Sequence, residues 1–269
     1  MKPVNVVCMK WKKEDGTDKF GPEYVNRLYR MVKKNLTIPH RFVCFTDDVN
    51  GLDKGIEAMA LPHVKLRTGL PERGWKKLGL FTAKLGDLSG TALFLDLDVV
   101  IVDNIDDLFK VPGRFIIARD TAKNEEFGNS SVFRFEIGQH ADILKFFEEN
   151  FDTIRQEVRH EQAYMSREMK KKGIFSFWDQ AAAQSTDGHG PCVCRKQSYC
   201  NGWCVSFKYC CMLPFPFNWF ITPKIPNGVR VVIFHGRPNN EQAMNGYTAK
   251  FGLRHVRPIE WIRKYWVDA

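Results

Sequence analysis

Short hydrophobic runs alternate with amphipathic segments in the first part of the chain. The β-branched run over residues 4–9 and the run over residues 41–46 have the length of strands and are bounded by polar residues. Between them, residues 22–35 carry apolar side chains at helical spacing, and Pro22 suits the first turn of a helix. This β-α-β pattern predicts an α/β protein with a mostly parallel sheet flanked by helices.

The same reasoning extends the pattern along the rest of the chain. It predicts further strands near residues 56–61, 91–95, 99–102, 114–118, 131–135, 174–178 and 229–234. It also predicts helices over residues 78–88, 105–109, 140–151 and 161–172. Because no internal repeat or long linker interrupts this series, we expect a single domain over residues 1–269.

Composition and charge narrow the class of protein. Hydrophobic residues make up 44% and charged residues 26%, as in folded globular proteins and unlike disordered chains. No stretch reaches the roughly eighteen apolar residues of a membrane-spanning helix, and the first residues lack a secretory signal, so we expect a cytoplasmic location. The net charge of +9 favours anionic partners such as phosphorylated sugars, anionic lipids or nucleic acid.

The strongest candidate chemistry follows the most hydrophobic predicted strand. Asp96 and Asp98 stand at the carboxyl end of the run over residues 91–95, which is where ligands bind in open α/β sheets. Two close carboxylates are stabilised by a hard cation such as Mg²⁺ or Mn²⁺, which can bridge them to the phosphates of a nucleotide. Taken alone, an Asp-x-Asp sequence can also cap an ordinary turn.

The residues around this motif resemble a known family. Residues 93–109 are similar to the strand, Asp-x-Asp motif and following helix of family 8 glycosyltransferases, which are retaining enzymes with the GT-A fold. Residues 232–238 resemble the C-terminal strand of that family, which ends in a metal-binding histidine. The resemblance therefore implies a metal site made of Asp96, Asp98 and His235, and a neutral imidazole beside two carboxylates suits Mn²⁺.

Two other segments match parts of the donor site in that family. After the histidine, the family pattern continues with Gly, Lys, Pro and Trp. In this chain Gly236 follows the histidine directly and Arg237 is the nearest cation. This departure from the pattern leaves open whether Arg237 contacts the diphosphate. Asn129 and Ser130 lie in a segment similar to the family's Asn-x-Gly strand, which implies hydrogen bonds to the donor sugar. An ordinary turn before a strand would use the same residues.

The family also places an Asp-Gln pair at the start of a helix near the anomeric carbon. Glu161 and Gln162 begin a predicted helix at the expected place in the order of elements, and they are the preferred match. Asp179, which is followed by Gln180, matches the pair in letters but falls later in the chain and is the alternative. An acidic residue at either place would also be favourable simply as the start of a solvated helix.

The resemblance divides the chain into a nucleotide-binding half, residues 1–110, and an acceptor-binding half, residues 111–269. Asp47 and Asp48 end the second strand, where contact with the ribose or base is implied, although capping of a turn explains them as well. Basic residues precede the Asp-x-Asp strand where GT-A enzymes bind the donor, and Lys76 is the preferred phosphate contact. A solvated basic turn is the alternative.

The region over residues 188–228 is irregular, rich in Cys and aromatic residues, and without an equivalent in the family. Its cysteine spacing is not that of two C-x₂-C zinc knuckles, so we expect reduced thiols, with zinc as the alternative. The aromatic residues of 215–220 could form a platform for a sugar acceptor or belong to the core. Residues 261–266 mix cations with aromatic rings, which suits either an anionic membrane surface or a final packed helix.

Together these observations predict a metal-dependent glycosyltransferase. It would use Mn²⁺ or Mg²⁺ and move a sugar from a UDP- or GDP-sugar to a glycan or lipid-linked acceptor, with peripheral association at the inner face of a membrane. The resemblance implies retention of configuration and a role in cell-surface polysaccharide assembly. A metal-dependent nucleotidyl or phosphoryl transferase is one alternative, because paired aspartates hold metals there too. A nucleic-acid-binding module is the other, but the basic residues are scattered and no nucleic acid is expected.

Overall fold

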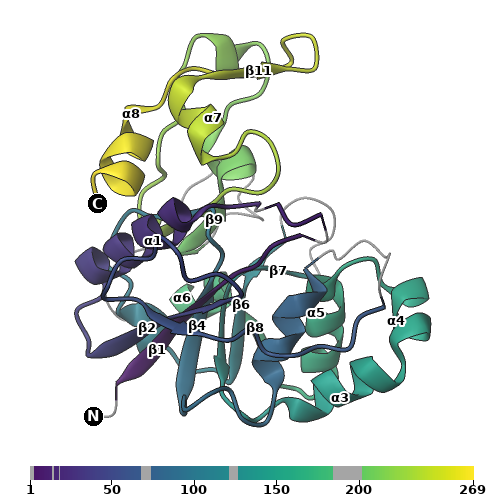
Figure 1. The fold of residues 1–269 in the computed structure, drawn as a ribbon. Helices are drawn as coiled ribbons and strands as arrows, with labels where there is room; N and C mark the ends of the chain where they lie inside the picture. The colour runs from purple at the N-terminus through teal and green to yellow at the C-terminus, as the bar shows by residue number, and fades with distance from the viewer. Residues whose placement is uncertain (1–2, 14, 18, 68–73, 121–126, 184–201) are drawn as a thin grey trace.

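The computed structural model describes residues 3–13, 15–17, 19–67, 74–120, 127–183 and 202–269. Its centre is a seven-stranded sheet with the order β3-β2-β1-β4-β7-β6-β8 (Figure 1). The strands are β1 (Val4–Lys10), β2 (His40–Thr46), β3 (Glu57–Met59), β4 (Thr91–Leu95), β6 (Phe115–Arg119), β7 (Gly128–Glu136) and β8 (Phe175–Phe177). Each of them overlaps a run that the hydrophobic pattern predicts, and the α/β class is confirmed.

One strand runs against its neighbours. The pairs β3·β2, β2·β1, β1·β4 and β6·β8 are parallel, whereas β7 is antiparallel to both β4 and β6. The backbone N–H of Asp96, just after β4, donates to the carbonyl of Ser131 in β7 at 2.8 Å. The beginning of β7 therefore lies beside the carboxyl end of β4, and it brings Ser130 to the same edge of the sheet as Asp96.

Helices cover both faces of this sheet (Figure 1). Alternate side chains of β1 point to opposite faces, so Val6 and Cys8 pack with helix α1 (Pro22–Asn35) while Val7 and Met9 belong to the second core. The second face carries the 3-10 helix η1 (Trp75–Phe81) with α3 (Ala141–Glu149), α4 (Phe151–Glu157) and α5 (Glu161–Lys171). The sheet is thus buried on both sides, as a largely parallel sheet requires.

Two predicted helices differ from the structure. Residues 78–88 do not form one α-helix, because η1 ends at Phe81 and turns follow. Glycine explains the difference: a Cβ on Gly79 would lie 2.9 Å from the carbonyl oxygen of Pro62, and Gly86 has a φ of +59°. Residues 140–151 break into α3 and α4 at Asn150, whose φ of −120° is not helical.

A three-stranded sheet joins the C-terminal segments to the main body. It consists of β5 (Val99–Ile101), β10 (Val231–Ile233) and β9 (Cys204–Ser206). Beyond it stands a C-terminal lobe with the hairpin of β11 (Tyr247–Ala249) and β12 (Arg254–Val256), at the top of Figure 1. The remaining helical segments are α2 (Asp107–Lys110), α6 (Trp178–Ala183), η2 (Phe207–Cys211), η3 (Phe217–Trp219), α7 (Asn240–Asn245), α8 (Glu260–Ile262) and η4 (Arg263–Val267).

The aromatic residues near the end of the chain pack inward. Trp266 is fully buried. Its ring centroid lies 5.2 Å from that of Tyr24, and the guanidinium carbon of Arg27 lies 4.1 Å from the Trp266 ring. The packed alternative is therefore confirmed for this tryptophan, which leaves it unable to meet a membrane surface. In the described ranges no helix has the length and apolar character needed to cross a bilayer.

The cysteines of the irregular region do not all remain thiols. Cys210 is disulfide-bonded, whereas Cys204 and Cys211 remain thiols. The expectation of reduced thiols is therefore wrong for Cys210, and because disulfides persist in oxidising surroundings, this residue does not support the expected cytoplasmic location. Within the described ranges no three His, Cys, Asp or Glu side chains are grouped to hold a metal such as zinc. Three further cysteines lie outside those ranges: Cys192, Cys194 and Cys200.

Candidate active site

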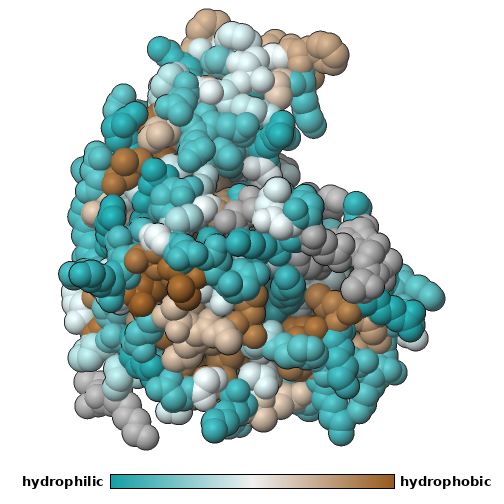
Figure 2. Space-filling view, viewed as in Figure 1, coloured by the Kyte–Doolittle hydropathy of each residue, from teal (hydrophilic) through white to brown (hydrophobic). Residues whose placement is uncertain are grey.

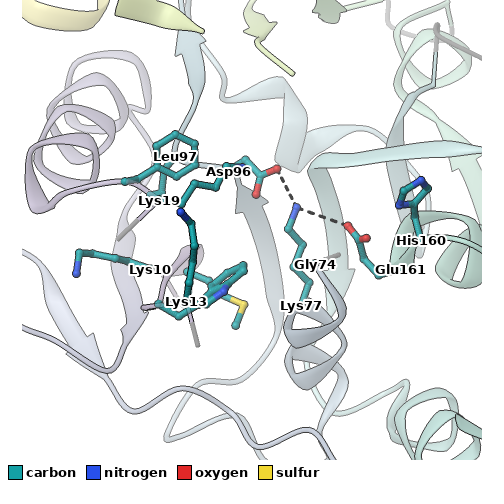
Figure 3. Close-up of a pocket in the computed structure, with 12 residues that line it drawn as sticks. Lys10, Lys13, Lys19, Gly74, Lys77, Asp96, Leu97, His160 and Glu161 are labelled. Carbon is teal, nitrogen blue, oxygen red and sulfur yellow. Dashed lines mark hydrogen bonds and ion pairs between the residues drawn. The ribbon is translucent and has the colours of Figure 1, made fainter. Parts of the chain in front are cut away.

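A pocket of about 420 Å³ opens at the carboxyl ends of β1 and β4. Its walls carry more positive than negative side chains, because four lysines face two carboxylates. These residues are Lys10, Lys13, Lys19, Lys77, Asp96 and Glu161. Figure 3 shows the first three lysines on one side of the pocket and Lys77 between the two carboxylates on the other. This is the edge of the sheet at which α/β proteins bind ligands.

The buried ammonium group of Lys77 organises one wall of the pocket. Its Nζ lies 2.8 Å from Oδ2 of Asp96 and 3.9 Å from Oε1 of Glu161. It also donates to the carbonyl and hydroxyl oxygens of Ser130, both at 3.3 Å. The Ser130 hydroxyl in turn donates to Glu161 Oε1 at 2.7 Å. One cation thus connects η1, the end of β4, the start of β7 and the start of α5.

The charge state of Lys77 follows from this arrangement. Burial alone would lower the pKa of its ammonium group, but the nearby carboxylates of Asp96 and Glu161 outweigh burial, and the pKa is raised. Lys77 therefore stays protonated at neutral pH although its side chain is only 8% exposed. A buried cation held in this way is available to a phosphate that enters the pocket.

Glu161 stands at the start of α5, but solvation is not its role. Its side chain is 8% exposed and faces Lys77 and Ser130. Gly74 lies directly against it with a φ of +80°, and a Cβ at that position would lie 2.6 Å from the carboxyl carbon of Glu161. The alternative of a solvated helix terminus is excluded, because this carboxylate is buried in the pocket wall.

The proposed metal ligands do not form one cluster in the structure. Burial first, and then crowding by the neighbouring Asp96 carboxylate, raise the pKa of Asp98 to about 7. His235 lies with a different set of groups: its Nε2 is 2.8 Å from the hydroxyl oxygen of Ser206, and its backbone carbonyl accepts from Lys208. Burial, together with the nearby cations Lys208 and Arg254, lowers the pKa of His235 to about 4, so its ring is neutral at neutral pH.

These donors suit a divalent cation in their chemistry. The crowding that raises the pKa of Asp98 would be relieved by a positive ion between the two aspartates, and a neutral imidazole is a metal ligand at neutral pH. The structure does not bring Asp96, Asp98 and His235 into a three-membered site within the described residues. Asp96 instead has Lys77 as its counter-ion.

The crowded pair predicts an unusual dependence of stability on pH. Since the pKa of Asp98 in the folded protein, about 7, lies above the ordinary value of 3.8 for an aspartate, the fold favours the protonated carboxyl. This contribution to the free energy of unfolding is complete below about pH 4 and is lost as the pH rises through about 7. In the presence of a chelator, Asp98→Asn should remove the effect, because its amide does not ionise.

Urea unfolding of the wild type and of Asp98→Asn near pH 5 and near pH 8 provides the measurement. The variant should gain stability relative to the wild type as the pH is raised. Carboxylates whose pKa is lowered, such as Asp106 and Asp142, change the free energy of unfolding with pH in the opposite direction. Their contribution is the same in both proteins, so it cancels in the comparison. If the stability difference between the variant and the wild type were the same at both pH values, the raised pKa of Asp98 would be contradicted.

The other predicted donor contacts lie around the pocket or away from it. Lys76 directs its ammonium group toward Trp11, 5.7 Å from the ring centroid, and it is the next residue, Lys77, that enters the site. Asp47 accepts from the backbone N–H of Lys12 at 3.1 Å, and Asp48 pairs with the Lys12 ammonium at 3.0 Å. These two aspartates therefore hold the loop that follows β1 and do not line the pocket.

The remaining predicted residues have partners of their own. Asn129 Oδ1 accepts from the backbone N–H of Ser131 at 2.9 Å, and Gln162 Nε2 donates to Asp120 at 3.0 Å. Asp179 pairs with Arg119 at 2.7 Å, and its other carboxylate oxygen, Oδ1, is buried without a hydrogen-bond partner among the described residues.

Gly236 and Arg237 follow His235 on the exposed surface. Gly236 has a φ of +66°, so glycine is favoured there. Arg237 accepts a hydrogen bond at its backbone carbonyl from Arg254 at 3.2 Å. Neither residue lines the pocket that holds Lys77.

Sequence reasoning missed part of the pocket. Lys10, Lys13 and Lys19 lie in and after the end of β1, in a stretch rich in Lys, Asp and Gly. That composition was the available signal, because a basic loop at the carboxyl end of a parallel strand is a suitable place for an anion. Trp11 and Phe20 line the same pocket and add apolar surface to it.

Comparison with known proteins bears on this arrangement. No family model matches the chain, and no curated protein matches it in sequence. The fold, however, is similar to the crystal structure of the galactosyltransferase LgtC in complex with donor and acceptor sugar analogs, with a TM-score of 0.53 and 13% identity over 88% of each chain. The fold is GT-A. An active-site mutant of LgtC gives a TM-score of 0.52 and 12% identity over 88% of this chain and 89% of that one.

The GT-A fold agrees with the expectation from the sequence. At this level of identity the likeness concerns the path of the backbone and not the individual side chains. What the site does therefore has to be argued from its own residues.

Proposed function

We propose that this protein is a glycosyltransferase that uses a nucleotide-sugar donor bound in the basic pocket. The observation that carries the proposal is the buried Lys77, held between Asp96 and Glu161 at the carboxyl edge of a GT-A sheet. A diphosphate needs positive groups around it, and the pocket offers four lysines against two carboxylates. The solved GT-A neighbour was crystallised with donor and acceptor sugar analogs, which supports the same two substrate classes here.

The parts of the donor would be distributed over the pocket. Lys10, Lys13 and Lys19 would face the diphosphate, and the adjacent rings of Trp11 and Phe20 would supply apolar contact for the base. Lys77 would stabilise the negative charge that develops on the leaving nucleoside diphosphate. Because Lys77 is already positioned by Asp96 and Ser130, little reorganisation is needed when that charge appears.

A divalent ion belongs to the same proposal. Asp96 and Asp98 would hold Mn²⁺ or Mg²⁺ with His235 as a further ligand, and the ion would supply Lewis-acid neutralisation of the diphosphate. The support is the crowding of the two aspartates and the neutral state of His235.

The carboxylate of Glu161 is the group in the pocket that would face the sugar. A negative group there would stabilise the positive charge that develops at the anomeric carbon as the bond to phosphate breaks. Asp179 remains the alternative, because one of its buried oxygens has no partner. Retention of configuration is part of the proposal, as is a glycan or lipid-linked acceptor.

A thermal-shift screen tests the proposed function. UDP- and GDP-sugars, each with and without Mn²⁺, are expected to raise the melting temperature, and the rise should be larger when the metal is present. AMP and inorganic phosphate serve as controls for general attraction of anions to a basic protein. Indifference to every nucleotide sugar, combined with tight salt-sensitive binding of RNA or DNA, would overturn the proposal in favour of a nucleic-acid-binding function.

A further inference from the structure

Large hydrophobic side chains are exposed at one end of the C-terminal lobe. Most of those that are exposed in the described residues belong to two segments, residues 215–221 and residues 251–253. We call this surface the aromatic tip, and its members are Phe215, Phe217, Trp219, Phe220, Ile221, Phe251 and Leu253. Figure 2 shows hydrophobic residues gathered at the top of the lobe. Such a concentration of exposed apolar side chains marks an interaction surface.

The two segments form one rigid surface. The rings of Trp219 and His255 are stacked, with centroids 3.9 Å apart, and the Trp219 indole N–H donates to the carbonyl of Gly252 at 2.9 Å. Asn218, which is buried, donates to the carbonyl of Leu253 at 3.3 Å. The guanidinium of Arg257 donates to the carbonyl of Phe220 at 2.9 Å. The exposed rings are therefore presented by a fixed scaffold.

The turn of the β11–β12 hairpin projects one of these rings outward. Lys250 and Phe251 have φ values of +52° and +54°, although neither is glycine. Left-handed conformation is unfavourable for a bulky side chain, and Phe251 is also completely exposed. Among the described residues none covers the Phe251 ring to offset that cost, which points to a contact outside the chain.

The charge of the surrounding segment selects the partner. Residues 203–259 contain seven Lys and Arg but a single acidic residue, Glu241. Glu241 lies 4.0 Å from Arg27 and so faces another cation. Lys224, Lys250 and Arg257 are exposed next to or within the segments that form the tip. An identical positive surface on a second copy of the chain would be repelled, whereas an anionic surface would be attracted.

We propose that the aromatic tip docks on a bilayer that contains anionic lipid. Phe220 and Phe251 would enter the interface between head groups and acyl chains, and the surrounding cations would bind the head groups. A flat sugar platform fits less well, because His255 covers one face of Trp219 and because Ile221 and Leu253 are aliphatic.

A cavity lies next to the tip, on the side of the lobe that carries His235. A second cavity, of about 460 Å³, is lined by Leu253 of the tip and by Lys208 and Tyr209. Tyr209 stacks on His235, with ring centroids 6.0 Å apart, and Lys208 donates to the His235 carbonyl. The cavity therefore extends from the tip to two residues that contact His235. Docking through the tip would allow this cavity to receive the head group of a lipid-linked acceptor, a role that rests on the proposed function.

Sedimentation with vesicles tests the docking. The full chain should bind vesicles of phosphatidylcholine mixed with phosphatidylglycerol, and bind vesicles of phosphatidylcholine alone much more weakly. The double variant Phe220→Ser/Phe251→Ser should bind the anionic vesicles about a hundredfold less tightly, because each buried phenyl ring contributes about tenfold. Lys224→Ser/Lys250→Ser should weaken the same binding by about tenfold or more and reduce its dependence on salt.

Phe146→Ser is the matched control, because Phe146 is an exposed ring on α3, outside the tip. It should leave vesicle binding unchanged. Equal binding of the wild type and the Phe220→Ser/Phe251→Ser variant to anionic vesicles, or no binding by the wild type, would overturn the proposal. A dimer that this variant abolishes, without vesicle binding by the wild type, would assign the tip to self-association instead.

The thermal shift produced by UDP with Mn²⁺ separates this proposal from the proposed function. That shift should be the same in the tip variants and the wild type, because no tip residue lines the Lys77 pocket. Loss of vesicle binding with an intact shift concerns the tip alone. A wild type that binds vesicles but no nucleotide would leave the docking standing and remove the enzymatic proposal.

Discussion

Replacing Lys77 with methionine is expected to slow sugar transfer strongly and to destabilise the fold. Methionine keeps the length of the side chain but removes the cation between Asp96 and Glu161, which leaves two carboxylates facing each other in a largely buried site. Breaking a buried ion pair in this way costs about 3–5 kcal/mol of stability. Removing one preorganised positive charge that stabilises the leaving group lowers kcat by about 10²–10³-fold.

A transfer assay and urea unfolding of the same preparation measure the two effects. Lys84→Met is the control for loss of a lysine, because Lys84 is exposed in the turn after η1. Lys76→Met tests the residue that the sequence favoured, and it should reduce activity much less than Lys77→Met. Loss of transfer in Lys76→Met with full activity in Lys77→Met would contradict the site as described.

The second large effect is expected from Asp98→Ala. This variant should lose metal-dependent transfer by more than about 10³-fold, because it removes one of the two carboxylates proposed to hold the ion. It should nevertheless fold, since it removes a carboxyl group whose burial, together with the neighbouring Asp96, disfavours its charged form. The change therefore separates loss of function from loss of structure.

Transfer measured against Mn²⁺ concentration, with the melting temperature as a check on folding, tests this expectation. Asp103→Ala is the matched control, because Asp103 is an exposed aspartate shortly after the motif. Its side chain accepts from the backbone N–H of the next residue, Asn104, at 2.7 Å. Turnover retained by Asp98→Ala at saturating donor would remove the assigned role of this residue.

The sequence was most informative where hydrophobic pattern and chain position act together. The strand that ends before Asp96 is a run of apolar residues, and this run alone places the aspartate at the carboxyl edge of the sheet. The place of Glu161 at the start of a helix was also predicted, because the resemblance puts an acidic residue there and the helix itself can be located from periodicity. In the structure this residue meets Lys77, although its partner lies more than eighty positions earlier in the chain.

The choice between Lys76 and Lys77 could not be made from the sequence. It depends on which face of residues 75–81 points inward, and that segment is a 3-10 helix with about three residues per turn instead of the expected α-helix. The change of period rotates neighbouring side chains to different faces. Tight packing of Gly79 against Pro62, which is a long-range contact, sets this geometry.

The aromatic segment over residues 215–220 shows a second limit. Its composition is that of a core, and the sequence left open whether it is buried or a sugar platform. In the structure most of its rings are exposed, while Trp266 is buried. Local composition cannot distinguish an exposed ring from a buried one, because burial depends on whether a segment distant in the sequence packs over the ring. For Trp266 that segment is α1, and residues 215–220 receive only the β11–β12 hairpin beside them.

The packing of Trp266 against α1 also constrains how the protein is made. A ribosome adds Tyr24 and Arg27 long before Trp266, whose ring completes their core. During most of translation the corresponding stripe of α1 lacks its native cover. The nascent chain should therefore engage chaperones until Trp266 emerges from the ribosome, and the core around α1 should be completed only after that point.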